Sequence, residues 1–281
     1  MNDDDQSSKT GGPKTTGPKS KVPELNLRTF IERLEAVKEN PAREAVVTSA
    51  APEERKRQHI KSMATPVIWN QEDLYSKKVI FTGMRQRELI NAFREVRIRL
   101  LQKSKTDNMV ALVAALTPGG GNSFVAFNLA ATFALDRQKT ALYVDCNPYN
   151  SCAGQFTIEP VEYGLTQYLH DYTIPLKRII YPSGLERLRV IPSGSGSDSA
   201  AEFFNSKRME VFITEIKHRY PDRFIVLDAP SVQGSTEARI LAQYCDHALL
   251  VVPFGKTTQE DILSGIDAVG QDKFSGLIFN H

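Results

Sequence analysis

The sequence predicts an α/β fold in which a mostly parallel sheet carries helices on both faces. Six short segments are almost wholly apolar, as strands that are buried on both faces are. Helical periodicity returns between most of them, which is the pattern of alternating strands and helices. The six segments are residues 109–116, 140–145, 188–193, 223–230, 247–254 and 276–280. Because ligands of such sheets bind at the carboxyl ends of the strands, we look for a site there.

Composition fits an ordinary globular protein. The chain has 281 residues, of which 41% are hydrophobic and 24% charged, enough for one large core and a small extra region. Its 35 basic residues nearly balance 33 acidic ones, leaving a net charge of +2. No global field therefore draws the chain to nucleic acid, and we expect no nucleic-acid partner.

The three cysteines, Cys146, Cys152 and Cys245, are an odd number at low density, and the amino terminus shows no secretory leader pattern. We expect free thiols in a reducing cytoplasm.

Residues 108–135 carry no charge and could span a bilayer by length, but Pro118 and three glycines would break a spanning helix. A buried strand, a turn and a buried helix explain this stretch better, so we expect a soluble chain.

The domain organisation is predicted in three parts. Residues 1–22 are rich in Gly, Pro, Ser, Thr and Lys and predict a disordered tail. Residues 23–80 predict one amphipathic helix followed by a charged linker and an irregular lead-in at 66–73. Residues 81–281 form the predicted α/β domain.

The first helix of this domain is expected near residues 86–103. Its apolar side is formed by Leu89, Ile90, Phe93, Val96, Leu100 and Leu101, and its other side is basic. Such a basic side is either a solvated helix face or a docking face for another subunit or for acidic lipid headgroups.

Further helices are expected near residues 123–136, 164–170, 200–219, 235–243 and 258–269. Residues 191–204 combine a strand, a Ser- and Gly-rich connection and a helix start, with Asp198 or Ser199 as its cap. His170, His218 and His247 have no paired spacing that would indicate a metal site.

The stretch TPGGGNSFVAFNLA, residues 117–130, follows the first strand and resembles a phosphate-binding loop. Such a loop holds phosphate with backbone N–H groups and a helix amino terminus, a lysine on the outer phosphates and a Ser or Thr on magnesium. Three glycines and Ser123 are in place, but Leu116 stands for the first glycine and Asn122 for the lysine.

Two aspartates end predicted strand segments. Asp145 closes ALYVD and Asp228 closes RFIVLD. An aspartate at a strand end is often only a turn or helix cap. Together with the glycine loop, however, the pair predicts a nucleotide site in which Asp228 organises magnesium.

With these motifs, residues from Glu88 to Asn280 resemble the cytoplasmic domains of bacterial tyrosine autokinases of capsule and exopolysaccharide synthesis, in the MinD and ParA branch of P-loop ATPases. The matches are the AFREVRIRL helix, PGGGNSFVAFNLA, LYVDCNP and VLDAPS. The resemblance implies that ATP or ADP is held by Gly119, Gly120, Gly121, Asn122, Ser123, Phe124 and Asn280. It implies Mg²⁺ on Ser123 and Asp228, Asp145 beside the attacked phosphate, and ring contacts through Arg94 and Arg97.

The departures from the family pattern concern its charges. The loop lysine is Asn122, and Thr117 stands where MinD and ParA proteins carry a second lysine. The family's second acid is Asn147, the arginine after it is Tyr149, and the acid of the ring motif is Asn91. The last tyrosine of this sequence is Tyr244, so we expect the carboxyl-terminal tyrosine cluster to be absent.

These departures predict a pseudokinase with weak or no nucleotide binding, because phosphoryl transfer depends on positioned positive charge. The resemblance implies a cytoplasmic regulator, peripheral at the inner face of the membrane, that docks on a polysaccharide co-polymerase and touches the membrane only through that partner. Two alternatives remain: an active tyrosine kinase or ATPase, and a MinD- or ParA-like positioning switch. Self-association is left open.

Overall fold

The computed structural model describes residues 69–104, 108–195, 200–219 and 223–280. The predicted tail, the predicted helix that follows it and most of the predicted linker lie outside these residues. Asp198 and Ser199, the two candidate helix caps, also lie outside them.

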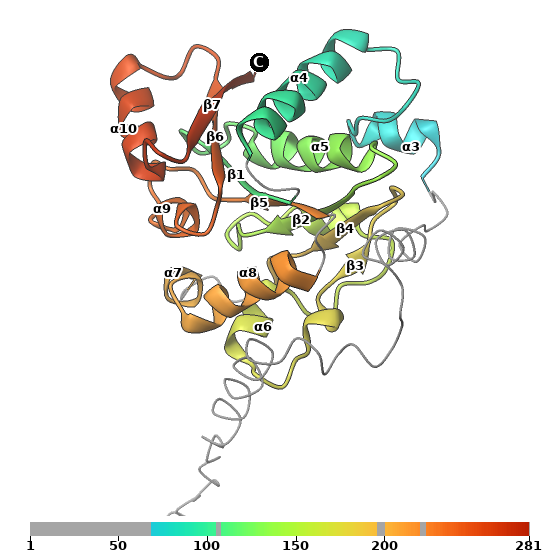
Figure 1. The fold of residues 1–281 in the computed structure, drawn as a ribbon, viewed down its shortest axis with the longest axis vertical. Coiled ribbons are helices and arrows are strands. Elements are labelled where there is room, and N and C mark those ends of the chain that lie inside the picture. The colour runs from blue at the N-terminus through green and yellow to red at the C-terminus, as the bar shows by residue number, and fades with distance from the viewer. Residues whose placement is uncertain (1–68, 105–107, 196–199, 220–222, 281) are drawn as a thin grey trace, which may run out of the picture. The chain divides into compact units, whose positions relative to one another are not determined.

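The described residues form one seven-stranded sheet in the order β3-β4-β2-β5-β1-β6-β7 (Figure 1). Every neighbouring pair is parallel except β3 and β4. The central strands β1, β2 and β5 are buried at every position, which explains their unbroken apolar sequence. The mostly parallel α/β fold predicted from the sequence is thus confirmed. The strands are β1 (Val110–Ala115), β2 (Thr140–Asp145), β3 (Tyr181–Pro182), β4 (Leu188–Ile191), β5 (Arg223–Asp228), β6 (His247–Pro253) and β7 (Phe274–Asn280).

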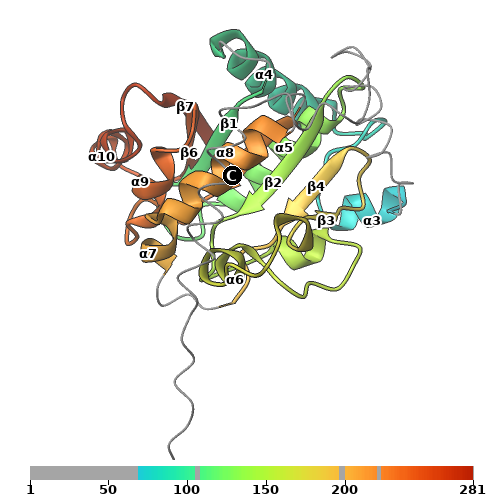
Figure 2. The same ribbon diagram turned by 60° about the horizontal axis from the view of Figure 1, so that its bottom comes forward.

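Helices cover both faces of the sheet (Figures 1 and 2). One face packs against α3 (Gln71–Ser76), α4 (Arg87–Lys103) and α5 (Asn122–Ala134). The other packs against α6 (Leu165–His170), α7 (Ala200–Phe204), α8 (Lys207–Arg219), α9 (Glu237–Ala242) and α10 (Gln259–Val269). Alternating residues of one strand serve the two cores: Ala111 and Val113 face α5, whereas Val110 and Leu112 face the opposite layer.

The uncharged stretch of residues 108–135 forms β1, the glycine loop and α5. Eleven of the thirteen residues of α5 are buried, so its apolar character reflects a central place in the core. Of the helices that the structure describes, none combines the length and the apolar surface needed to cross a bilayer.

The predicted helix at 200–219 is two helices, α7 and α8. The break lies at Ser206, whose hydroxyl donates to the Phe203 carbonyl at 2.6 Å and accepts from the Met209 N–H at 3.2 Å. A serine that bonds its own backbone in this way ends one helix and caps the next. The two-residue strand β3 also escaped prediction, since Tyr181 and Pro182 show no alternating pattern.

The segment before α4 belongs to the folded domain instead of to the predicted lead-in and linker. Asn70 and Asp73 form a reciprocal capping box that starts α3, and Leu74 is buried. Val79 and Ile80 are fully buried. The amide of Asn128 holds this segment: its Oδ1 accepts from the Ile80 N–H at 2.7 Å, and its Nδ2 donates to the carbonyls of Lys78 and Phe124, each at 3.0 Å.

Trp69, the single tryptophan of the chain, packs on the turn that holds Gly184. A Cβ at Gly184 would lie 1.9 Å from the indole Cδ2, so only glycine lets the ring approach this closely. The ammonium of Lys77 lies 4.9 Å from the ring centroid on this partly buried indole.

Candidate functional site

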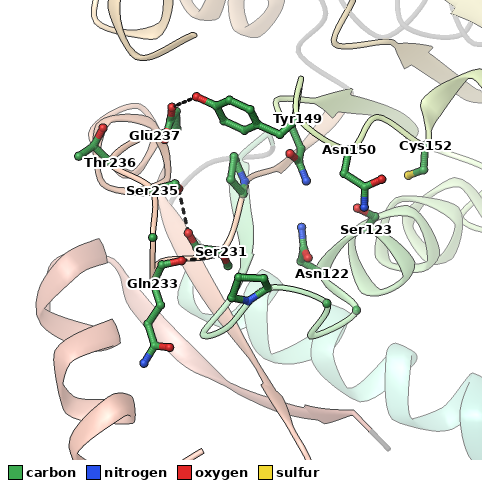
Figure 3. Close-up of a pocket in the computed structure, with 16 residues that line it drawn as sticks. Asn122, Ser123, Tyr149, Asn150, Cys152, Ser231, Gln233, Ser235, Thr236 and Glu237 are labelled. Atoms are coloured by element: carbon green, nitrogen blue, oxygen red, sulfur yellow. Dashed lines mark hydrogen bonds between the residues drawn. The ribbon is translucent and has the colours of Figure 1, made fainter. Parts of the chain in front are cut away.

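The site lies where β1, β2 and β5 end at one edge of the sheet. Asp145 and Asp228 are register partners in the β2–β5 pair, so their carboxylates lie on adjacent strands. The glycine loop after β1 lies next to them, and a cavity of about 890 Å³ opens between the loop, residues 147–152 and residues 230–237. Figure 3 shows Asn122 and Ser123 facing this cavity, with Tyr149 and Glu237 across from them.

The loop backbone has the shape of a phosphate cradle. Gly121 caps α5 with φ +88°, a conformation that a residue with a Cβ rarely adopts. At Gly120 a Cβ would lie 2.7 Å from the Ala115 Cβ. The backbone N–H groups at the start of α5 therefore line the cavity as donors for an oxyanion.

The side-chain amide of Asn122 has no N–H group left to donate to a phosphate. The residue is 8% exposed, and its Nδ2 donates to Asp228 Oδ1 at 2.8 Å and to the Ala229 carbonyl at 2.7 Å. Both N–H bonds of the amide are thus directed at the strand end that carries the acid.

Asp228 is fully buried and hydrogen-bonded on both oxygens. The Tyr143 hydroxyl donates to Oδ2 at 2.7 Å, opposite the bond from Asn122. Burial, with the neighbouring Asp145 carboxylate as the second cause, raises the pKa of Asp228 to about 7. Hydrogen bonds from Ser123, Tyr143 and Asn122 lower this pKa and offset part of the rise. At neutral pH this carboxyl therefore holds a proton part of the time.

Asp145 organises its own loop. Its Oδ1 accepts from the Asn147 N–H at 2.9 Å, and its Oδ2 accepts from the Ser151 hydroxyl at 2.8 Å and from the Ala153 N–H at 3.3 Å. Burial raises the pKa of Asp145 to about 6, although these hydrogen bonds lower it. The carboxylate thus closes residues 147–153 into a turn.

The remaining loop residues divide between the cavity and the core. Ser123 lines the cavity. Phe124 packs edge-to-face on Phe93 of α4, with ring centroids 6.3 Å apart. Asn280 donates from Nδ2 to the Gly120 carbonyl at 3.2 Å, and a Cβ at Gly121 would lie 2.2 Å from that nitrogen. Asn280 therefore packs against the loop itself.

The two arginines of the ring motif differ. Arg94 is exposed on α4. Arg97 is half-buried, and its Nη1 donates to the Thr132 carbonyl of α5 at 3.0 Å. Only Arg94 of the two presents its side chain mainly to solvent.

Two site residues were not found from the sequence. Tyr143 shares a face of β2 with Asp145, two residues on, and strand alternation could have placed it beside the acids. Glu237 begins α9 and is 4% exposed, and it accepts from the Tyr149 hydroxyl at 2.5 Å. No sequence signal separates Glu237 from an ordinary first-turn acid.

The charges around the cavity decide which groups it fits. None of its sixteen lining residues is Lys or Arg. Phosphate fits the loop backbone, whereas both oxygens of Asp228 already accept a hydrogen bond, from Asn122 and from Tyr143, which compete with a magnesium ion or its waters. Elsewhere in the described residues, no group of three or more His, Cys, Asp or Glu side chains is placed to hold a metal.

Comparison with known proteins identifies the fold and the family. No family model matches the sequence. A tyrosine-protein kinase CpsD of Streptococcus pneumoniae serotype 4 is 30% identical over 183 residues, covering 64% of this chain and 79% of that protein. The kinase domain of the Escherichia coli tyrosine kinase ETK superposes with a TM-score of 0.62 at 21% identity, covering 83% of this chain and 94% of that one.

A cell-division ATPase MinD of Pyrococcus furiosus superposes with a TM-score of 0.50 at 20% identity, over 61% of this chain and 70% of that one. This likeness and that to ETK establish a P-loop NTPase-like fold. The sequence identity to CpsD, over most of that protein's length, goes further. The chain belongs to the bacterial tyrosine autokinase family.

Proposed function

We propose that this chain is a non-catalytic member of the family, a regulator of capsule or exopolysaccharide assembly that uses the kinase fold for contact. The observation that carries the proposal is the pair of hydrogen bonds from Asn122 to Asp228 and to the Ala229 carbonyl. A neutral amide stands where the family has a cation, and it is bound to the acid that would organise magnesium.

The chemistry of phosphoryl transfer explains why this pair of bonds matters. The transferred group carries charge on its equatorial oxygens, and a positioned cation stabilises that charge in the transition state. Losing one such group costs about 3 kcal/mol, a hundredfold or more in rate. An amide whose N–H groups already bond Asp228 and Ala229 supplies neither the charge nor a free donor.

Nucleotide binding is a separate matter from transfer. The loop backbone and Ser123 remain, so weak binding of ATP or ADP is compatible with the proposal. The absence of Lys and Arg from the cavity wall disfavours a polyphosphate, which brings several negative charges.

The partner in this proposal is a membrane polysaccharide co-polymerase, with the chain peripheral at the cytoplasmic face. The exposed side of α4, with Arg94, Ile98 at 43% exposure and Leu101 at 38%, supports a protein contact there. Family membership suggests this class of partner.

The test is a titration of ATP and ADP, with and without Mg²⁺, against the wild type and Asn122→Lys. Because the lysine would restore the missing charge, we expect the variant to bind ATP at least about tenfold more tightly. Calorimetry measures this directly. Asn91→Lys, at an exposed position of α4 outside the cavity lining, adds the same charge and is expected to leave ATP binding unchanged.

Turnover separates this proposal from its main competitor, an active kinase, which the likeness to CpsD favours. Pure wild-type protein is expected to show neither ATP hydrolysis nor phosphotyrosine. Turnover at rates usual for kinases that Asp228→Ala abolishes would contradict the proposal.

A further inference from the structure

The cavity between Tyr149 and the glycine loop has a charge pattern opposite to that of a nucleotide site. Its wall contains one carboxylate, Glu237, and no Lys or Arg among the lining residues. Two more carboxyls, Asp145 and Asp228, lie buried beneath the wall. A ligand that carries negative charge meets repulsion here, and one that carries positive charge meets attraction.

Glu237 is the residue whose surroundings indicate a ligand. Its side chain is 4% exposed, yet it lines the cavity. One oxygen, Oε1, accepts from the Tyr149 hydroxyl, and Oε2 receives no hydrogen bond from any residue that the structure describes. Because this oxygen is not among the side-chain atoms that are buried without a partner, it is open to the cavity, where a donor of a ligand can reach it.

Tyr149 supplies the second half of the site. The residue is 55% exposed and lines the cavity, and its hydroxyl bonds Glu237 (Figure 3). A tyrosine ring beside a buried carboxylate is suited to a planar cation, which can stack on the ring and donate to the acid. Asn147 and Asn150 also line the cavity and add neutral amide groups to its wall.

We propose that this cavity receives the guanidinium of an arginine presented by a protein partner, with Glu237 as its anion and Tyr149 as its stacking surface. The inference rests on the proposed function in one respect, that nucleotide does not compete for the cavity. Guanidinium is favoured over ammonium because its five donors can meet Glu237 and the surrounding amides at once.

The test compares two peptides, acetyl-Gly-Arg-Gly-amide and the same peptide with citrulline, which is neutral and nearly the same shape. Each is titrated into the ¹⁵N-labelled full chain, and the amide signals of Gly234, Ser235 and Asn147 are followed. We expect the arginine peptide to shift these signals saturably and to bind at least about tenfold more tightly than the citrulline peptide. Equal binding of both peptides would overturn the proposal.

Two variants keep the result specific to the site. Glu237→Gln preserves shape and the bond from Tyr149, and should weaken arginine binding at least about tenfold. Glu260→Gln, on the exposed face of α10, removes the same charge elsewhere and should leave binding unchanged. An equal loss of affinity in both variants would mean that binding depends only on the net charge of the protein, and would contradict the proposal.

Tyr149→Phe separates a binding role from a structural one. The variant keeps the ring and frees Glu237 from its competing hydroxyl, so the arginine peptide should bind as tightly as to the wild type or more tightly. Weaker binding by tenfold would contradict the stacking arrangement.

The source of the arginine can be distinguished by light scattering. Self-association that Glu237→Gln abolishes identifies a second copy as the donor, and a monomer at all concentrations identifies a different protein. Failure of the proposed function would appear as ATP turnover, which the two peptides do not report. Arginine selectivity and catalytic inactivity can therefore fail independently.

Discussion

Asn122 and Asn128 lie on the same helix, α5, and both amides are buried. Asn128 bonds three backbone groups, the Ile80 N–H and the carbonyls of Lys78 and Phe124. Asn122 bonds one backbone carbonyl and one ionisable side chain, Asp228, at the wall of a cavity. The first amide holds the architecture together, whereas the second depends on the protonation of its partner and can be reached by solvent or ligand.

The largest expected effect comes from removing the structural amide. Asn128→Ala leaves the buried Ile80 N–H and the part-buried Lys78 carbonyl without their amide partner, which should lower the free energy of unfolding by about 2–4 kcal/mol. Urea unfolding measures it. Asn91→Ala, on the exposed side of α4, is the matched control and should change stability by less than about 0.5 kcal/mol. A cost below about 1 kcal/mol for Asn128→Ala would mean that water replaces the amide.

The next effect is a dependence of stability on pH that Asp228 and its neighbour Asp145 create together. Because burial raises the pKa of both carboxyls in the folded protein, the folded state binds more protons than the unfolded chain between about pH 4 and about pH 7. The stability contributed by the protonated form is present at the low end and is lost as pH rises through the folded pKa. We therefore expect the free energy of unfolding to fall over this range.

Asp228→Asn should flatten that slope and make the protein more stable than the wild type above about pH 7. Asp261→Asn is the control. Hydrogen bonds from Thr258 lower the pKa of Asp261, so the contribution of this carboxyl to stability is lost as pH falls, opposite to that of Asp228. Denaturant titrations at several pH values check both. A wild-type stability that rises from pH 5 to about pH 7 would contradict the raised pKa of Asp228.

The smallest effect is expected at the site amide. Asn122→Ala removes two hydrogen bonds, but the cavity admits water to the groups left behind, so the cost should be about 1 kcal/mol near neutral pH. Chemical unfolding of this variant beside Asn128→Ala measures the difference directly. Equal costs would show that the two amides are both structural.

Much of this molecule could be predicted from its sequence. Unbroken apolar strands and helical periodicity gave the parallel sheet, and the convergence of parallel strand ends placed Asp145 and Asp228 beside the glycine loop. α3 was missed, because six residues with one buried leucine give no periodic pattern. The segment around Ile80 looked like a linker because its anchor, Asn128, lies 48 residues away.

The orientation of Asn122 could not be predicted for a related reason. Its partner Asp228 lies 106 residues further along the chain, and only the folded sheet brings them together. Sequence reasoning identified the missing lysine, but not that the replacement bonds the acid. The Tyr149–Glu237 contact is likewise tertiary and joins the loop after β2 to the first residue of α9.

The close packing of Trp69 on Gly184 gives the protein an optical reporter of its own. The only indole of the chain lies at the segment that Asn128 anchors and lines a different cavity from Tyr149 and Glu237. Tryptophan emission should therefore report detachment of residues 69–80 and stay constant when a ligand enters the cavity. A red shift that precedes the loss of far-ultraviolet circular dichroism would reveal this segment as the first part of the domain to open.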